Sequence, residues 1–202
     1  MKLYFNPASP FVRKVRMVAE AKNLSEKIEL IDCVLTPVNP DENVIQDNPL
    51  GKIPALYSEN IGWLYDSRVI CEYLDQFGSG AILFPATGID RWSTLRFQSV
   101  GDGICDAAIL VRYERFVRSE NEQSEVWVSG QMEKVQRGLS WLEQQVSELK
   151  NRTDIGAIAL ACALGYLDFR IPDLGWRESN PQLANTFEQL KTLPGFSATS
   201  PD

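Results

Sequence analysis

Histidine is absent from this 202-residue chain. Its imidazole is the side chain most often used as a general base near neutral pH, and it is the commonest protein ligand for metal ions. A Ser-His-Asp hydrolase or a zinc enzyme is therefore not expected, and no metal cofactor is predicted.

Cysteine is scarce and scattered. The four residues are Cys33, Cys71, Cys105 and Cys162, with no CxxC pair and no spacing typical of a metal site. This content is too low for a secreted scaffold held together by disulfides, so we expect a protein of the reducing cytoplasm.

The chain also lacks a basic surplus and a long apolar run. Its net charge of −7 leaves no broad basic surface for phosphates, so nucleic acid is not an expected partner. The longest apolar stretch, residues 155–167, is too short to span a bilayer and predicts a buried core helix. Basic residues interrupt the first twenty positions, where a signal peptide needs an apolar run. No membrane association is expected.

What the chain does contain is 44% hydrophobic residues, enough for a packed core, in two segments of different character. Residues 1–77 combine short strand patterns, the second at 27–35, with helical ones in the order β-α-β, then β-β-α. The Pro- and Asn-rich run at 36–50 between the two halves is a loop with room for a short helix, which would complete the order β-α-β-α-β-β-α. The stretch "GSGAILFPATG" at 78–88 concentrates glycine and proline and predicts an interdomain linker. Residues 89–202 are predicted to be helical. The expected fold is a small α/β domain followed by an all-α domain.

Apolar periodicity supports the helical domain. Between Val128 and Leu149 apolar residues alternate steps of four and three, as in helix bundles. A second helix, within 90–118, is predicted to turn one face inward, formed by Trp92, Leu95, Val100, Ile104, Ala108 and Val111. Asp154 is expected to cap the core helix that begins near Ile155.

Ser9 precedes Pro10 at the turn between an expected strand at 2–5 and an expected helix ending near Asn23. Serine is a good helix N-cap, and proline suits the first helical turn. The free N–H groups and the dipole of a helix N-terminus also favour an anion. Two interpretations stay open. Ser9 is a plain cap, or its hydroxyl also faces a thiolate, whose pKa would then fall below about 8.5.

The stretch "NPLGKIPAL" at 48–56 places an apolar residue and a proline at the mouth of a strand. Such a pair marks a possible cis peptide bond. A cis Ile53-Pro54 bond would turn the N–H and C=O of Ile53 out of the sheet, where a peptide-like ligand could pair with them. The alternative is an ordinary turn at a strand entry.

The stretch "DSRVICEYL" at 66–74 begins another expected helix. Free N–H groups and the Ser67 hydroxyl could hold a carboxylate there, and Asp66 could pair with an ammonium group. Together they would recognise the two charged groups of an amino acid. The alternative is again a simple helix cap.

These three motifs, followed by a helical half that contains "ALACALGYLDFR", resemble a bacterial glutathione S-transferase. The resemblance covers nearly the whole chain, and the three motifs in this order are highly specific to the superfamily. The chain is most similar to the small proteobacterial YibF-like subgroup, whose serine lies in the same Ser-Pro-Phe-Val-Arg-Lys context. The resemblance implies a thioredoxin-like domain at 1–77, a linker at 78–88, a helical bundle domain at 89–202 and a homodimer. The helical domain is expected to form the electrophile pocket and much of the dimer interface.

The resemblance also implies residue roles. The backbone of Ile53 would contact the cysteinyl part of glutathione, and Asp66 with Ser67 would hold the γ-glutamyl end. Lys52 lies close enough to help with a carboxylate. The implied glutathione-binding set is Lys52, Ile53, Pro54, Asp66 and Ser67.

The chain departs from two variants of the family site. Tyrosine-type members use a tyrosine near the end of the first strand, but Tyr4 is too early and Pro7 and Ala8 occupy the later positions. Cysteine-type members carry a thiol at the start of the first helix, and this chain has none there. Thiol–disulfide chemistry is therefore not expected, and Ser9 is the implied catalytic residue.

The absence of histidine shapes the expected mechanism. Ser9 cannot act as a base, so it would donate a hydrogen bond to the thiolate of glutathione, the co-substrate, whose proton leaves to solvent. The expected activity is glutathione transfer to a small hydrophobic electrophile, a detoxification reaction. A glutathione-assisted reduction or isomerisation at the same site stays open as an alternative.

Aromatic side chains are expected to hold the electrophile. The candidates are Phe11, Tyr113, Tyr166, Phe169 and Trp176. For each of them the alternative is a core position, because aromatic residues at helical spacing usually pack inward.

Asp102 and Asp106 lie on one predicted helix. In related dimers an acidic residue of this helix reaches the amino group of glutathione in the neighbouring subunit. The alternative is a solvated helix face.

A second class of function stays open. Some relatives keep the two-domain body without catalysis and act as regulators or protein-interaction scaffolds. A glutathione carrier without turnover is also compatible with the sequence. The combined presence of Ser9, Ile53-Pro54 and Asp66-Ser67 favours an enzyme or a glutathione binder over a pure scaffold.

Overall fold

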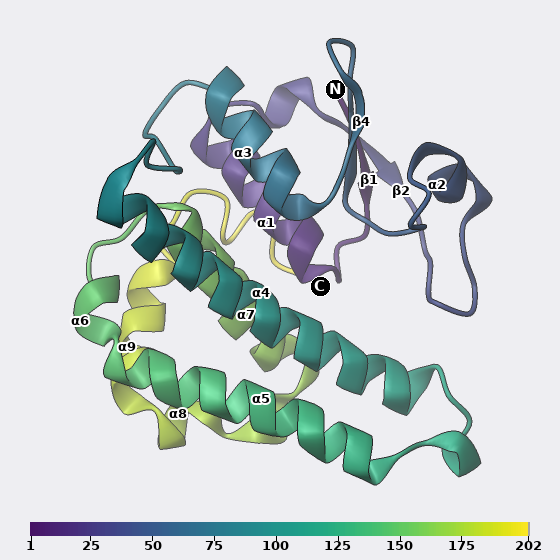
Figure 1. The fold of residues 1–202 in the computed structure, drawn as a ribbon, viewed down its shortest axis with the longest axis vertical. Coiled ribbons are helices and arrows are strands. Elements are labelled where there is room, and N and C mark those ends of the chain that lie inside the picture. Colours follow the sequence, from purple (N-terminus) through teal and green to yellow (C-terminus); the bar gives the residue numbers. More distant parts are fainter. Residues whose placement is uncertain (202) are drawn as a thin grey trace. The chain divides into compact units, whose positions relative to one another are not determined.

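The computed structural model describes residues 1–201, which form two compact units. The first contains Met1–Thr87 and the segment that begins at Leu193, and the second is Gly88–Thr192 (Figure 1). The first unit is an α/β structure and the second is helical, which confirms the predicted fold class.

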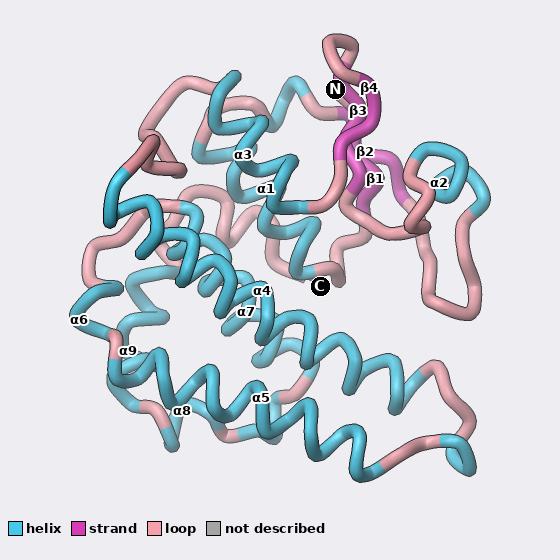
Figure 2. The backbone as a smooth tube through the Cα atoms, viewed as in Figure 1, coloured by secondary structure: helices cyan, strands magenta, loops and turns pink. Residues whose placement is uncertain are grey.

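A four-stranded mixed sheet forms the centre of the first unit (Figure 2). Its strands are β1 (Lys2–Phe5), β2 (Glu29–Asp32), β3 (Ala55–Ser58) and β4 (Gly62–Leu64), in the order β2-β1-β3-β4. β1 runs parallel to β2 and antiparallel to β3, and β4 pairs antiparallel with β3. The strand predicted at 27–35 is shorter because a 3-10 turn, Ser25–Lys27, precedes it.

Helices cover both faces of this sheet. They are α1 (Pro10–Ala21), α2 (Glu42–Asp47) and α3 (Ser67–Phe77). α1 packs against α3 on one face, and α2 lies on the other (Figure 2). Because strand side chains alternate between faces, Leu3 and Tyr4 of β1 point in opposite directions. Tyr4 joins Val44 of α2 in one small core. The observed order is the predicted β-α-β-α-β-β-α.

The segment predicted as a linker belongs to the first unit up to Thr87. The ammonium of Lys22 lies 3.0 Å from the carboxylate of Asp75, and both side chains are almost fully buried. The same carboxylate accepts hydrogen bonds from the backbone N–H groups of Leu83 (3.0 Å) and Phe84 (3.1 Å). These contacts hold the segment after α3 against the unit.

The C-terminal segment also belongs to the first unit, whereas the expected boundaries put it in the helical domain. The buried guanidinium of Arg13 donates a 2.9 Å hydrogen bond to the carbonyl of Phe196 and stacks 4.2 Å from its ring centroid. Gly195, at φ +76°, brings its backbone against the side chain of Glu20, where a Cβ atom would come within 2.7 Å. Arg13 of α1 therefore holds the C-terminal segment in place.

The second unit is helical throughout its length. Its helices are α4 (Gly88–Phe116), α5 (Glu125–Gln144), α6 (Val146–Leu149), α7 (Ile155–Arg170), α8 (Trp176–Ser179) and α9 (Pro181–Leu190). Short 3-10 turns occur at Glu120–Glu122 and Pro172–Leu174. α7 is buried along most of its length, as predicted for the core helix, and α4 packs against both α7 and α5.

Small residues let α4 and α7 approach closely. A Cβ atom on Gly101 would lie 2.8 Å from the carbonyl carbon of Ala159. At the start of α7, Asp154 accepts the N–H of Ala157 (3.1 Å) and a hydrogen bond from Thr94 of α4 (2.9 Å). The predicted Asp154 cap is confirmed, and it also ties the two helices together.

The predicted inward face of α4 is partly wrong. Trp92 is 66% exposed, whereas Thr94, Phe97 and Gly101 are buried. Trp92 precedes Thr94 by two residues, which is about 200° around a helix, so it points away from the buried face. The close approach of α4 to α7 at Gly101 determines which face of α4 is buried. Glycine is not counted in a pattern of apolar residues, so the pattern did not reveal this face.

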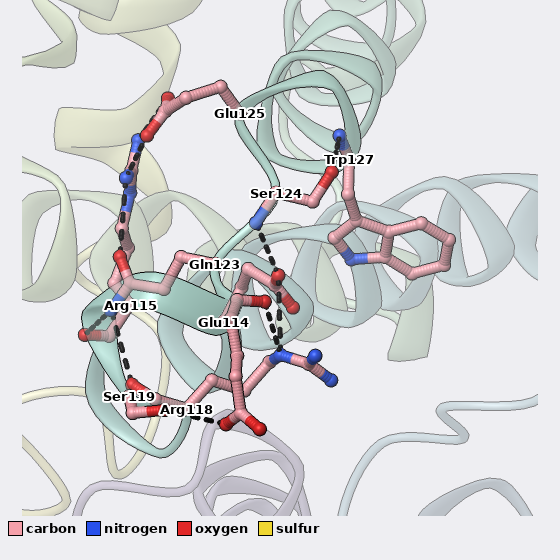
Figure 3. Close-up of polar contacts among 9 residues, drawn as sticks. Glu114, Arg115, Arg118, Ser119, Gln123, Ser124, Glu125 and Trp127 are labelled. Carbon is pink, nitrogen blue, oxygen red and sulfur yellow. Dashed lines mark hydrogen bonds and ion pairs between the residues drawn. The ribbon is translucent and has the colours of Figure 1, made fainter.

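A polar network closes the turn between α4 and α5 (Figure 3). Arg115 forms a two-pronged ion pair with Glu125, and Glu114 accepts the backbone N–H of Ser124 at 2.7 Å. Ser124 caps α5 by accepting the N–H of Trp127 (3.2 Å). Arg115 in the last turn of α4 and Arg118 just beyond it thus have carboxylate partners.

Among residues 1–201, no single helix is both long and apolar enough to cross a membrane, although the bent pair Ile155–Arg170 and Pro172–Ser179 passes that test of length and composition together.

Candidate functional site

Three segments leave the same end of the sheet. The registers of β1 with β3 and of β3 with β4 bring together the C-terminal end of β1, the N-terminal end of β3 and the C-terminal end of β4. Ser9 follows the first of these ends, Ile53 precedes the second, and Asp66 follows the third. The three sequence motifs therefore gather at one end of the sheet within the first unit.

Ser9 is the N-cap of α1. Its hydroxyl oxygen accepts the N–H of Val12 at 3.3 Å, and its own N–H donates to the carbonyl of Asn6 at 3.1 Å. Asn6 also accepts the N–H of Ala8 (3.0 Å) and donates to the carbonyl of Cys33 (3.1 Å). Because the Ser9 oxygen serves as the acceptor, its hydroxyl hydrogen stays available for a ligand at the positive end of the helix dipole.

Asn48 organises the loop that leads to Ile53. Its buried side chain accepts the N–H of Leu50 (3.1 Å) and donates to the carbonyl of Lys52 (2.8 Å). Gly51 takes the left-handed φ of +58° that this tight loop requires. The Lys52 side chain is exposed at the loop's end.

The Ile53-Pro54 peptide bond is cis, which is the first of the two interpretations of this motif. Pro54 is buried and Ile53 is half-buried. Within residues 1–201, neither the N–H nor the C=O of Ile53 takes part in a backbone–backbone hydrogen bond. An extended peptide can therefore pair with this backbone as an added strand.

Tyr4 anchors α2 beside this loop. Its hydroxyl donates a 2.8 Å hydrogen bond to Asp47, and its ring stacks 4.9 Å from the ring of Trp63. Burial, reinforced by Asp47, raises the pKa of Tyr4 to about 12, so the phenol stays neutral. Its hydroxyl is thus committed to a structural contact, away from any bound thiol.

Asp66 and Ser67 begin α3. Asp66 is exposed, and one of its carboxylate oxygens accepts the N–H of Arg68 at 2.9 Å, as a helix cap does. Ser67 occupies the first helical position, where backbone N–H groups have no partner within the helix, and its side chain is almost fully buried. The peptide bond between Tyr65 and Asp66 is cis. Asp66 thus offers one carboxylate oxygen as an acceptor, and Ser67 at the start of α3 offers hydrogen-bond donors beside it.

Cys33 directly follows β2 and lies near this end of the sheet. Burial raises the pKa of its thiol to about 11, and the thiol donates to the carbonyl of Phe5 at 3.5 Å. A neutral, buried thiol is a poor nucleophile.

The expected pocket aromatics occupy different environments. Phe11 of α1 is half-buried, with the ammonium of Lys14 5.7 Å from its ring centroid. Trp176 is buried in the second unit, where its indole N–H donates to Asp168 at 2.8 Å and its ring meets Phe187 edge-on. Trp176 therefore occupies a core position.

The two tyrosines and Phe169 lie near the C-terminal ends of α4 and α7. Tyr113 is half-buried, and burial raises its pKa. Tyr166 is 6% exposed, and burial raises its pKa to about 12. Phe169 is half-buried, with the guanidinium of Arg170 4.0 Å from its ring centroid.

The two aspartates of α4 differ in exposure. Asp102 is 3% exposed, so it does not lie on a solvated helix face. Asp106 is exposed. In the part of the chain that the structure describes, no three His, Cys, Asp or Glu side chains gather as a metal site would require.

Sequence reasoning missed Asn6, Asn48 and Tyr4 as residues that position the site. Both asparagines precede a proline, and Asn-Pro is a turn signal that could have drawn attention to them. The role of Tyr4 depends on a partner more than forty residues away in the chain, so no local pattern reveals it.

Two family models match this chain. The N-terminal domain model of glutathione S-transferase matches residues 8–76, and the C-terminal domain model matches residues 125–185. The chain is also 34% identical to the GST-like protein YibF of Escherichia coli K12, over 100% of this chain and 98% of the relative.

Solved structures of similar sequence share the fold. A glutathione transferase family member from Pseudomonas fluorescens Pf-5, with bound glutathione, is 47% identical with a TM-score of 0.96 and covers 100% of this chain and 98% of its own. A second structure of such a protein holds S-(propanoic acid)-glutathione and is 45% identical, with a TM-score of 0.92 and full coverage of both chains.

Proposed function

This chain belongs to the glutathione S-transferase family, and we propose that it binds reduced glutathione and transfers it to a small hydrophobic electrophile. The observation that carries the proposal is the state of Ser9. Its hydroxyl oxygen is engaged by the N–H of Val12, which leaves its hydrogen to donate, and it stands at the start of α1 beside the ends of β1 and β3.

The proposed binding residues suit the parts of glutathione. The N–H and C=O of Ile53, preceded by Lys52 and followed by Pro54, pair with the cysteinyl backbone. Asp66 accepts the γ-glutamyl ammonium with its second carboxylate oxygen, and Ser67 donates to the α-carboxylate at the start of α3. The uncommitted backbone of Ile53 and the helix-terminal position of Ser67 support this assignment.

Bound glutathione supplies the nucleophilic sulfur. Ser9 donates a hydrogen bond to that sulfur, and the N-terminal dipole of α1 favours its negative charge. Because the chain contains no histidine, Ser9 acts as a donor and the thiol proton leaves to solvent. The homologous structures with bound glutathione and a glutathione conjugate support a site of this kind.

The remaining parts of the proposal are those that the resemblance to the family implies. The helical unit supplies side chains to the electrophile pocket, and the protein works as a cytoplasmic homodimer in detoxification. Tyr113 and Tyr166 stay in the proposed pocket, together with Phe11. Asp106, which is exposed, is better placed than Asp102 to reach a neighbouring subunit.

Calorimetric titration with reduced glutathione tests the binding site. We expect saturable binding by the natural protein and at least about tenfold weaker binding by Ser67→Ala, since a donor to a charged group contributes about 1.5–3 kcal/mol. Ser58→Ala, which changes a buried serine hydrogen-bonded to Tyr73, serves as the matched control and should bind normally. No binding at millimolar glutathione would overturn the proposal and favour an interaction scaffold.

A further inference from the structure

Two arginines of the helical unit lack the carboxylate partners that six others have. The six that form ion pairs are Arg96, Arg115, Arg118, Arg137, Arg152 and Arg177. Arg112 of α4 and Arg170 of α7 form no ion pair with any residue that the structure describes.

Helix geometry directs these two arginines toward each other. Arg112 lies eleven residues after Gly101, and Arg170 lies eleven residues after Ala159. Eleven residues make about three full turns, so each arginine shares the helix face of the earlier residue. Since Gly101 and Ala159 are in contact, and Thr94 contacts Asp154 in the preceding turns, the two helices run in the same direction and bring the arginines to the same level.

An aromatic ring lies against each of the two guanidinium groups. Arg112 stacks 3.3 Å from the ring centroid of Phe116, and Arg170 stacks 4.0 Å from that of Phe169. The Nε atom of Arg170 is buried and has no hydrogen-bond partner in the structure. A buried donor without a partner is destabilising, and a bound acceptor removes that cost.

Neighbouring charges do not satisfy the pair. Asp168 is the carboxylate closest in sequence to Arg170, but it is engaged by Trp176 and Arg177. Burial lowers the pKa of Arg112, and the positive charge of Arg170 lowers it further. An anion between the two guanidinium groups would relieve this repulsion.

Tyr166 and Tyr113 complete the cluster. Tyr166 lies close enough to interact electrostatically with both arginines and with Tyr113. Because its pKa is about 12, its hydroxyl is a neutral donor at physiological pH and would not repel an anion. The cluster therefore combines two cations and two phenols with aromatic rings.

We propose that Arg112 and Arg170 together bind the carboxylate of a small organic acid with an apolar body. This anion site stands on the helical unit alone and goes beyond the proposed transferase function. The carboxylate is held by charge and hydrogen bonds and is chemically unchanged.

The anion site is tested without glutathione. Binding of 3-phenylpropanoate and of its neutral amide is measured by calorimetry on the full chain. We expect the acid to bind at least about tenfold more tightly, and Arg112→Gln and Arg170→Gln each to abolish the preference. Arg137→Gln, which removes an exposed, paired guanidinium, is the control and should keep it. Equal binding of acid and amide by the natural protein, or a preference that survives the double variant, would overturn the site.

Discussion

The side-chain amide of Asn48 donates a 2.8 Å hydrogen bond to the backbone carbonyl of Lys52. Asn48 is 1% exposed, and it also accepts the N–H of Leu50. The residue after Lys52 is Ile53, whose backbone is proposed to pair with glutathione. One buried amide thus fixes the loop that presents the proposed binding edge.

Asn48→Ala should weaken both the fold and the site. Loss of these buried hydrogen bonds is expected to lower the free energy of unfolding by about 1–3 kcal/mol, and glutathione should bind more weakly because the loop before Ile53 loosens. Thermal unfolding and calorimetry measure the two effects. Asn43→Ala, at an exposed position of α2, is the control. Unchanged glutathione affinity in Asn48→Ala would show that the loop does not depend on this amide.

Arg13→Ala should release the C-terminal segment. The buried guanidinium holds the Phe196 carbonyl and contacts the Thr199 hydroxyl, so its loss leaves both without their donor. We expect the melting temperature to fall by several degrees, in line with a loss of about 2–3 kcal/mol, and proteolysis to increase after Leu193. Arg16→Ala, which removes a 3.5 Å contact with the Ala198 carbonyl and a guanidinium 5.0 Å from the ring centroid of Phe5, should have a smaller effect. Equal protease resistance of Arg13→Ala and the natural protein would contradict this role.

Replacing either of two glycines of α4 by alanine should change the stability of the protein, in opposite directions at the two positions. Gly101→Ala forces a Cβ atom to within 2.8 Å of the α7 backbone and should destabilise the protein by about 1–3 kcal/mol or more. Gly103→Ala meets nothing within 4 Å and should stabilise the helix by up to about 1 kcal/mol. Chemical denaturation of both variants checks the contrast. Similar stabilities would mean that α4 and α7 do not approach at Gly101.

Sequence patterns predicted the parts of the structure that local chemistry determines. Ser9, Asp66 and Asp154 cap helices as expected, because a cap needs only a short side chain and the N–H groups of the next turn. The order of strands and helices in the first unit was also predictable from hydrophobic periodicity.

Contacts between distant segments were not predictable in this way. Arg13 looks like a surface residue of an amphipathic helix, and its partners lie more than 180 residues further along the chain. Arg112 and Arg170 lie at the same height along their helices because α4 and α7 approach closely at Gly101. Glycine is not counted in a pattern of apolar residues, so the pattern did not reveal this. For the same reason the apolar pattern did not reveal that Trp92 is exposed.

Tyr166 should make the protein sensitive to alkaline pH. Its pKa is raised from 10.0 to about 12 in the folded chain, so the folded state keeps the proton longer than the unfolded state does. The resulting stability is present below about pH 10 and is lost as pH rises toward about 12. In Tyr166→Phe the free energy of unfolding should fall less steeply between about pH 10 and 12. Tyr4, whose pKa is also raised, remains in the variant, so some slope persists. Identical slopes would rule out this contribution of Tyr166.

The most direct test of the account is the pKa of the glutathione thiol bound to the natural protein and to Ser9→Ala, followed by the ultraviolet absorbance of the thiolate. The account predicts a bound pKa below the value of about 8.5 for a free thiol in the natural protein, and a clear rise in the variant. S-methylglutathione, which has no thiol to ionise, should bind both proteins equally. A bound thiol that ionises at the same pH in both proteins would contradict the role assigned to Ser9.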